Sequence, residues 1–89
     1  MKTGTASERG LEVLRTALDL TKRHGIAPSV RELTDAMGFK SVNATADHLD
    51  RLERTGLICW RTIGTTRIAR GLMVTQLGLR ALERSGGTP

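Results

Sequence analysis

Apolar residues recur at every third or fourth position in three stretches of the first 56 residues, which is the spacing of one buried face of an α-helix. The spacing predicts helices over about 8–24, 30–37 and 42–55. Local signals support these bounds, because Ser29 opens a Ser-x-x-Glu capping box, Ser41 is a good cap for the third helix, and a glycine follows each helix. The second and third helices, joined by a short turn, form a helix-turn-helix.

Each of these helices has one apolar face that it is expected to bury. The residues on those faces are Leu11, Leu14, Ala17, Leu18, Thr21, Val30, Leu33, Ala36, Met37, Val42, Leu49 and Leu52. Thr45 and Ala46 are neighbours, and the pattern leaves open which of the two faces the core. The third helix is expected to turn its polar side chains outward: Asn43, Asp47, His48, Asp50, Arg51 and Arg54.

The pattern changes after the third helix. Residues 57–60 are apolar and suit a strand, and residues 67–70 alternate as a half-buried return strand would. Residues 61–66, which include a glycine, fit the tip of a hairpin, and Thr75 can cap a last helix over about 76–84. That helix is expected to point Leu77 and Leu82 inward. The fold class is therefore mainly α with a small β-hairpin, a winged helix-turn-helix with the order helix-helix-helix-strand-strand-helix.

The length and the residue types limit what the chain can do. We expect a single domain over residues 1–89, with 1–6 and 85–89 as loose ends. A core of this size leaves little room for a catalytic pocket, and no nucleophile–base pair or phosphate-binding loop is visible, so we expect no enzyme and no cofactor. Cys59 is the single cysteine and stands apart from any metal-ligand cluster. With no signal peptide and no membrane span in the sequence, we expect a cytoplasmic protein.

The charge balance points to a polyanionic partner. Lys and Arg number 14 against 9 acidic residues, which gives a net charge of +5. Phe39 and Trp60 are the only aromatic residues, too few for a base-stacking platform of the kind that single-strand binders use. Duplex DNA is therefore favoured over single-stranded nucleic acid.

Four segments resemble the DNA-binding domain of LexA-type repressors. They are Gly25–Ser29, Arg31–Leu33, Met37–Ala44 and His48–Ile58, and the block Gly-Phe-Lys-Ser-x-Asn-Ala is the most specific part. The resemblance covers about half of the chain well. It implies a winged helix-turn-helix that binds DNA. LexA repressors continue into a self-cleaving, dimerising domain with a serine–lysine site, and the last helix predicted here looks instead like the closing helix of other bacterial regulators. A small phage, plasmid or bacterial regulator is therefore the expected identity.

The resemblance also implies which side chains read bases. The positions that match the family's base-reading residues are Ser41, Asn43, Ala44, Ala46 and Asp47. Their chemistry is suitable, since Asn43 can pair with adenine N6 and N7, Ala44 can touch a thymine methyl group, and Asp47 can accept from cytosine N4. Ala46 and Asp47 depart from the family's glutamates, so we expect a different target sequence. Three of these positions also have a structural explanation: Ser41 is a helix cap, Ala46 could be core, and Asp47 could pair with Arg51. Asn43 has no obvious structural role.

Five further residues are candidates for contacts with phosphates, which need only charge or donors and reach. Lys40 lies in the turn before the third helix, Ser29 begins the second helix, and Arg51 lies further along the third. Arg61 and Arg67 flank the hairpin tip, where a wing would meet the adjacent minor groove or backbone. The alternative for each arginine is an ordinary solvated surface charge.

Three interpretations stay open. The first is a sequence-specific transcriptional regulator of double-stranded DNA, a repressor that occupies its operator and excludes polymerase. The second is a protein-interaction module, an adaptor or antirepressor with a winged-helix fold that binds no DNA. The third is a DNA-binding fragment of a larger protein. A homodimer on an inverted repeat would supply the specificity that one winged helix lacks, with the first and last helices as candidate dimer surfaces.

Overall fold

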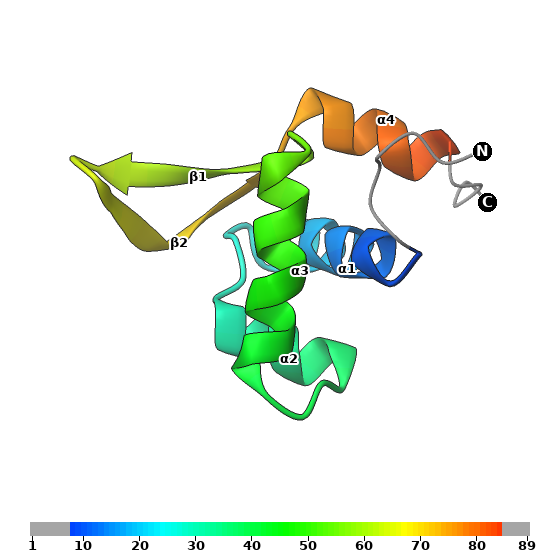
Figure 1. The fold of residues 1–89 in the computed structure, drawn as a ribbon, viewed down its shortest axis with the longest axis horizontal. Coiled ribbons are helices and arrows are strands. Elements are labelled where there is room, and N and C mark those ends of the chain that lie inside the picture. The colour runs from blue at the N-terminus through cyan, green and yellow to red at the C-terminus, as the bar shows by residue number, and fades with distance from the viewer. Residues whose placement is uncertain (1–7, 85–89) are drawn as a thin grey trace.

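The predicted order of elements is confirmed by a computed structural model, which describes residues 8–84 (Figure 1). The helices are α1 (Glu8–His24), α2 (Val30–Met37), α3 (Val42–Arg54) and α4 (Gln76–Arg84), within one residue of the predicted bounds. The strands β1 (Ile58–Ile63) and β2 (Thr66–Val74) form an antiparallel hairpin, called the wing below. The loose ends expected at 1–6 and 85–89 lie outside the described residues.

The strands are longer than predicted. The sequence pattern assigns residues 61–63 to the hairpin tip and leaves 71–74 as a link before the last helix, but both segments belong to the strands. The tip consists of Gly64 and Thr65 alone, and Gly64 has a φ of 63°, a left-handed conformation that glycine adopts without strain. A two-residue turn lets the pairing run almost to the end of the wing, which a longer loop would not.

The predicted helix caps are present. The Ser29 hydroxyl accepts from the backbone N–H of Glu32 at 3.1 Å, and the Glu32 carboxylate accepts from the N–H of Ser29 at 3.0 Å, which completes the capping box. Ser41 caps α3 by accepting from the N–H of Ala44, and Thr75 caps α4 by accepting from the N–H of Gly78. The turn between α2 and α3 is therefore fixed at both ends, because α2 closes on Gly38 in the left-handed conformation.

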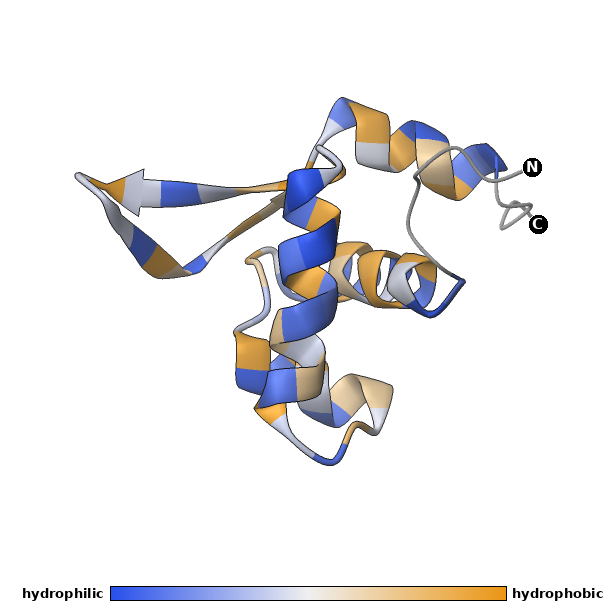
Figure 2. Ribbon diagram, viewed as in Figure 1, coloured by the Kyte–Doolittle hydropathy of each residue, from blue (hydrophilic) through white to orange (hydrophobic). Residues whose placement is uncertain are grey.

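The core lies where α1, α2 and α3 meet the base of the wing and α4. Its buried side chains are Val13, Leu14, Ala17, Leu33, Leu49, Leu52, Leu57, Ile58, Leu72 and Leu82. Hydrophilic residues dominate the visible face of α3 in Figure 2, while Leu49 and Leu52 of the same helix are buried. The helix is therefore packed on one side and open to solvent on the other.

Several predicted burial positions were wrong. Val42 is 40% exposed because it begins α3 at the solvent edge, and Leu77 is 52% exposed because Gly78 takes the inward position beside the backbone of Leu57. Ala36 is exposed, since the buried face of α2 is centred between Leu33 and Thr34. These residues lie at the margins of their helix faces, where periodic spacing alone does not decide which neighbour is buried.

The structure also decides between Thr45 and Ala46 and corrects the expectation for His48. Thr45 is completely buried and Ala46 is exposed, so Thr45 faces the core. His48, expected outside, is half-buried and stacks on Phe39 with ring centroids 5.6 Å apart. The Phe39 ring therefore packs on the side of α3, and Arg9 covers it from α1 with its guanidinium carbon 5.4 Å from the ring centroid.

The wing has a large irregularity in the middle. At its base Ile58 pairs with Val74 and Trp60 with Leu72, whereas toward the tip Thr62 pairs with Arg67. The four residues Ile68–Gly71 of β2 therefore lie opposite Arg61 alone, and β2 bends sharply along its length (Figure 1). A Cβ on Gly71 would lie 2.9 Å from the Arg61 carbonyl oxygen, so the crowded bend requires a glycine.

In the part of the chain that the structure describes, no helix has the length and apolar character needed to cross a membrane.

Candidate nucleic-acid interface

The first half of α3 presents most of the predicted base-reading residues to solvent. Ser41, Asn43, Ala46 and Asp47 are exposed, and Ala44 is half-buried. Thr45 is the one residue of this half that points fully into the protein, with 0% of its surface exposed. The five predicted residues therefore lie together at the N-terminal end of one helix, where a helix in a major groove contacts base edges.

A buried hydrogen bond, which the sequence did not reveal, holds this end of α3 against α2. The hydroxyl oxygens of Thr34 and Thr45 are 2.7 Å apart, and the Thr34 hydroxyl donates to the carbonyl oxygen of Val30 at 2.7 Å. Because Thr34 uses its one proton on Val30, Thr45 donates to Thr34. The two helices of the helix-turn-helix are thus joined at a fixed rotation, which decides that Ala46 and not Thr45 faces outward.

The alternative partner considered for Asp47 is not used. The ion pair on this helix surface joins Asp50 to Arg54 at 2.8 Å, and none joins Asp47 to Arg51 in residues 8–84. The Asp47 carboxylate is therefore exposed and is not neutralised by Arg51.

The predicted phosphate contacts separate into two kinds. Lys40, Arg51 and Arg61 are exposed and make no ion pair within the described chain. Ser29 and the first N–H groups of α2 are occupied in part by the capping box. These unpaired charges lie in the turn, on α3 and on the wing, and none would have to leave an ion pair within residues 8–84 to bind an anion.

Arg67 is different, because it already has two partners in the protein. Its guanidinium forms an ion pair with Glu53 of α3 and lies over the Trp60 ring, 5.1 Å from the centroid. Trp60 is half-buried and packs against the core, and its Nε1 is buried without a hydrogen-bond partner among the described residues. A phosphate contact by Arg67 would therefore require it to exchange Glu53 for DNA.

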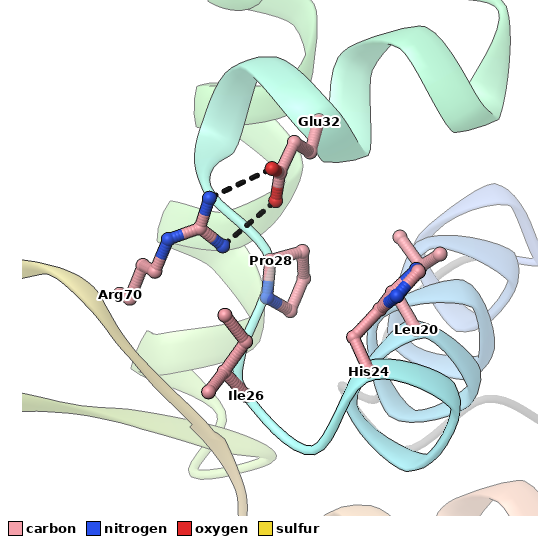
Figure 3. A pocket seen from close by; sticks show the side chains of 6 residues that line it. All are labelled: Leu20, His24, Ile26, Pro28, Glu32 and Arg70. Carbon is pink, nitrogen blue, oxygen red and sulfur yellow. Dashed lines mark hydrogen bonds and ion pairs between the residues drawn. The ribbon is translucent and has the colours of Figure 1, made fainter.

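Sequence reasoning also missed a bridge between the wing and α2, formed by Arg70 and Glu32 (Figure 3). Arg70 Nη1 donates to Glu32 Oε1 at 2.9 Å and Nη2 donates to Oε2 at 2.7 Å. Arg70 Nη1 also donates to the carbonyl oxygen of Ala27 at 2.8 Å. The hydrogen bonds from Arg70 and from the Ser29 N–H lower the pKa of Glu32 from 4.5 to about 2. The only local hint of the bridge was the capping-box glutamate, whose second role cannot be seen from sequence spacing.

Residues 8–84 contain no group of three His, Cys, Asp or Glu side chains placed to hold a metal ion. Cys59 is half-buried on β1.

A helix-turn-helix with an open polar second helix, followed by a basic hairpin and a closing helix, defines a winged helix-turn-helix protein. The chain belongs to the LexA DNA-binding domain family, whose model matches residues 4–67.

Individual relatives agree with this assignment. The chain is 35% identical over 81 residues to the LexA repressor of Anaeromyxobacter sp. (strain K). This match covers 91% of the chain and 34% of the repressor. The chain is 36% identical over 78 residues to the LexA repressor of Lactobacillus delbrueckii subsp. bulgaricus, and this second match covers 88% of the chain and 36% of that protein. The chain thus spans about a third of the length of these curated relatives.

The fold also resembles a solved structure, that of RV1404 from Mycobacterium tuberculosis. The TM-score is 0.67 over 92% of this chain and 52% of that one, with 20% sequence identity. At this identity the likeness supports the winged-helix fold and carries no argument about function.

Proposed function

We propose that the chain is a sequence-specific double-stranded DNA-binding domain of a transcriptional repressor, and that it acts by occupying an operator. The observation that carries the proposal is the orientation of α3 about its own axis, which decides which side chains face solvent. Ser41, Asn43, Ala46 and Asp47 face solvent, while the buried Thr45 fixes the helix to α2. Membership of the LexA DNA-binding domain family supports the same activity.

In the proposed complex α3 enters the major groove and reads bases through its first turns. Asn43 pairs with an adenine through both N6 and N7, and Asp47 accepts from a cytosine amino group. Ala44 and Ala46 meet thymine methyl groups, and the Ser41 hydroxyl donates or accepts at a base edge. Because Ala46 is small and exposed, the neighbouring side chains of α3 can approach the floor of the major groove closely.

The proposed phosphate contacts surround this helix. Lys40, the cap residue Ser29 and the first residues of α2 contact one DNA strand, and Arg51 contacts the DNA backbone further along α3. Arg61 of the wing reaches the neighbouring minor groove or its phosphates, and Arg67 joins it by releasing Glu53. The proposed activity is binding without catalysis and uses no cofactor. Two copies on an inverted repeat would supply the specificity that one module lacks.

The test is selection from a random pool of duplex DNA at two salt concentrations. We expect an enriched motif with a fixed base at the position read by Asn43. The Asn43→Ala variant should lose preference at that position by about 5- to 150-fold, which corresponds to about 1–3 kcal/mol for a bidentate contact. Gln76→Ala is the matched control, because it removes an exposed amide from α4 and should select the same motif as the wild type.

The opposite result is equally informative. Retention that enriches no motif and disappears with salt would reflect phosphate attraction alone. The proposal would then be rejected in favour of a protein-interaction module, the adaptor or antirepressor alternative.

A further inference from the structure

The middle of the wing is a joint between two differently paired halves. At the root of the wing Trp60 is paired with Leu72, and in the outer half Thr62 is paired with Arg67. Between these two halves Ile68–Gly71 have no regular partners. Ile58 and Leu72 anchor the base in the core, whereas most residues of the outer half are exposed, with Ile63 at 74%. Because a bulge of this kind re-aims a hairpin, the joint sets the direction of the outer half.

The joint has little buried apolar packing, because Ile68 is half-buried, Ala69 and Arg70 are exposed, and Gly71 has no side chain. Two open surface hollows flank it, one of about 450 Å³ on the side of α1 and the link to α2, and one of about 220 Å³ on the side of α3. The first is lined by Leu20, His24, Ile26, Pro28, Glu32 and Arg70 (Figure 3). The second is lined by Val30, Ala46, Leu49, Trp60, Arg67, Ile68 and Ala69. Apolar packing, which normally fixes how two elements meet, therefore contributes little at the joint.

Polar bonds cross the gap instead. Arg70, inside the joint, makes two bonds to the Glu32 carboxylate and one to the Ala27 carbonyl oxygen, at 2.7–2.9 Å. A planar guanidinium that meets a carboxylate through two parallel bonds fixes direction as well as distance, which a single lysine-type contact does not. Glu32 is itself held by the N–H of Ser29, so the acceptor is rigidly placed on the helix-turn-helix.

We propose that Arg70 and Glu32 are positioning residues for DNA binding: the bridge between them fixes the angle of the outer wing to the helix-turn-helix. Arg61, at the joint, then meets the DNA backbone while α3 occupies the major groove. This inference rests on the proposed function for its consequence on DNA. The orientation of the wing itself can be measured without DNA.

A pair of exposed charges often contributes little to stability, and the side chains of Arg70 and Glu32 are 42% and 50% exposed. The role assigned to the bridge is therefore to orient the outer wing, and the test measures that orientation instead of a melting temperature. Residual dipolar couplings of backbone N–H bonds in the free protein report the angle between residues 62–67 and the three helices. In the wild type a single alignment tensor should fit the couplings of residues 62–67 together with those of the three helices.

Three variants test whether the bridge between Arg70 and Glu32 sets the orientation of the outer wing. Arg70→Gln removes the guanidinium. Glu32→Gln breaks the charged bridge but keeps a side-chain oxygen to accept from the N–H of Ser29, as a capping-box glutamine does. Arg23→Gln is the control, since it removes the same charge from an ion pair within α1, with Asp19. We expect couplings in residues 62–67 to be reoriented or averaged in the two bridge variants, and unchanged in the control.

The second measurement is a hydroxyl-radical footprint on the selected duplex. In both bridge variants the protection made by the wing should disappear while the protection made by α3 remains. The slope of log K against log[salt] should become shallower by about 0.9 for each phosphate that the wing no longer neutralises. If the wild type selects no duplex, the proposed function fails, and the couplings still decide whether the bridge orients the wing.

Two results would overturn the inference. One is a set of couplings in Arg70→Gln and Glu32→Gln that matches the Arg23→Gln control. The other is a wing footprint that is absent in Arg70→Gln but intact in Glu32→Gln, because Arg70 would then be a direct phosphate ligand and no positioning residue.

Discussion

Replacing Gly78 with alanine should destabilise the protein, although alanine is the better helix former. Gly78 lies in the first turn of α4, and a Cβ there would overlap the carbonyl oxygen of Leu57 and lie 2.9 Å from Cγ1 of Val74. The Leu57 oxygen cannot move away freely, because it accepts from the N–H of Thr75 at 3.1 Å. The helix itself must therefore shift, and its buried Leu82 shifts with it.

Two opposing terms set the magnitude. The intrinsic gain from glycine to alanine in a helix is about 1 kcal/mol. Overpacking costs about 1–3 kcal/mol, and a contact with fixed backbone belongs at the upper end of that range. The difference is a loss of about 2 kcal/mol in the free energy of unfolding. For a domain of this size each kcal/mol lowers Tm by about 4–8 °C, so the expected fall is about 8–16 °C.

The assay is thermal unfolding followed by circular dichroism at a helical wavelength. The reverse substitution Ala46→Gly, at an exposed site in the second turn of α3, calibrates the helix term and should lower Tm by about 4–8 °C through propensity alone. A Gly78→Ala protein that melts at or above the wild-type temperature would refute the steric argument.

Three other predictions concern the interface. Thr45→Val keeps the shape but removes the bond to Thr34, which should cost about 1 kcal/mol in urea unfolding and loosen α3; an unchanged free energy would show that the bond contributes nothing. The folded-state pKa of Glu32 lies below its ordinary value, so the bridge contributes stability above about pH 4.5 and loses it as the pH falls toward 2. The Tm difference between wild type and Glu32→Gln should be small, because both side chains are about half exposed, and it should shrink over that window; a constant difference would contradict the linkage. Arg61→Gln should reduce the salt slope of DNA binding more than Arg67→Gln, because Arg67 must first leave its ion pair; equal slopes would contradict this order.

The helices could be predicted from sequence because their signals are local. Ser29 and Ser41 mark helix starts, and the structure places α2 and α3 within one residue of the predicted ends. The wing was harder, because its strands extend to a two-residue tip and change register in the middle, where Gly71 lies close to the backbone of Arg61, and no turn motif in the sequence marks that change. The outward position of Ala46 likewise depended on a hydrogen bond between side chains of α2 and α3.

The candidate site shows the same division. Residues that lie together on one helix, such as Asn43 and Asp47, can be grouped from helical spacing alone. The bridge from Arg70 to Glu32 joins residues 38 positions apart, and the ion pair of Arg67 with Glu53 joins residues 14 positions apart. No periodicity connects such pairs, so a single sequence does not show which arginines are free for a ligand and which are already bound within the fold.

The double register of the wing has a consequence for its dynamics. Pairing is continuous within the base and within the tip, but not across Ile68–Gly71, so opening of one half does not force opening of the other. Amide hydrogens of the base, near the buried Ile58 and Leu72, should exchange with solvent only in global unfolding. Those near Ile63 should exchange by local fraying many times more often. The hairpin thus behaves as two cooperative units, a stable root and a readily opened end, within one continuous ribbon.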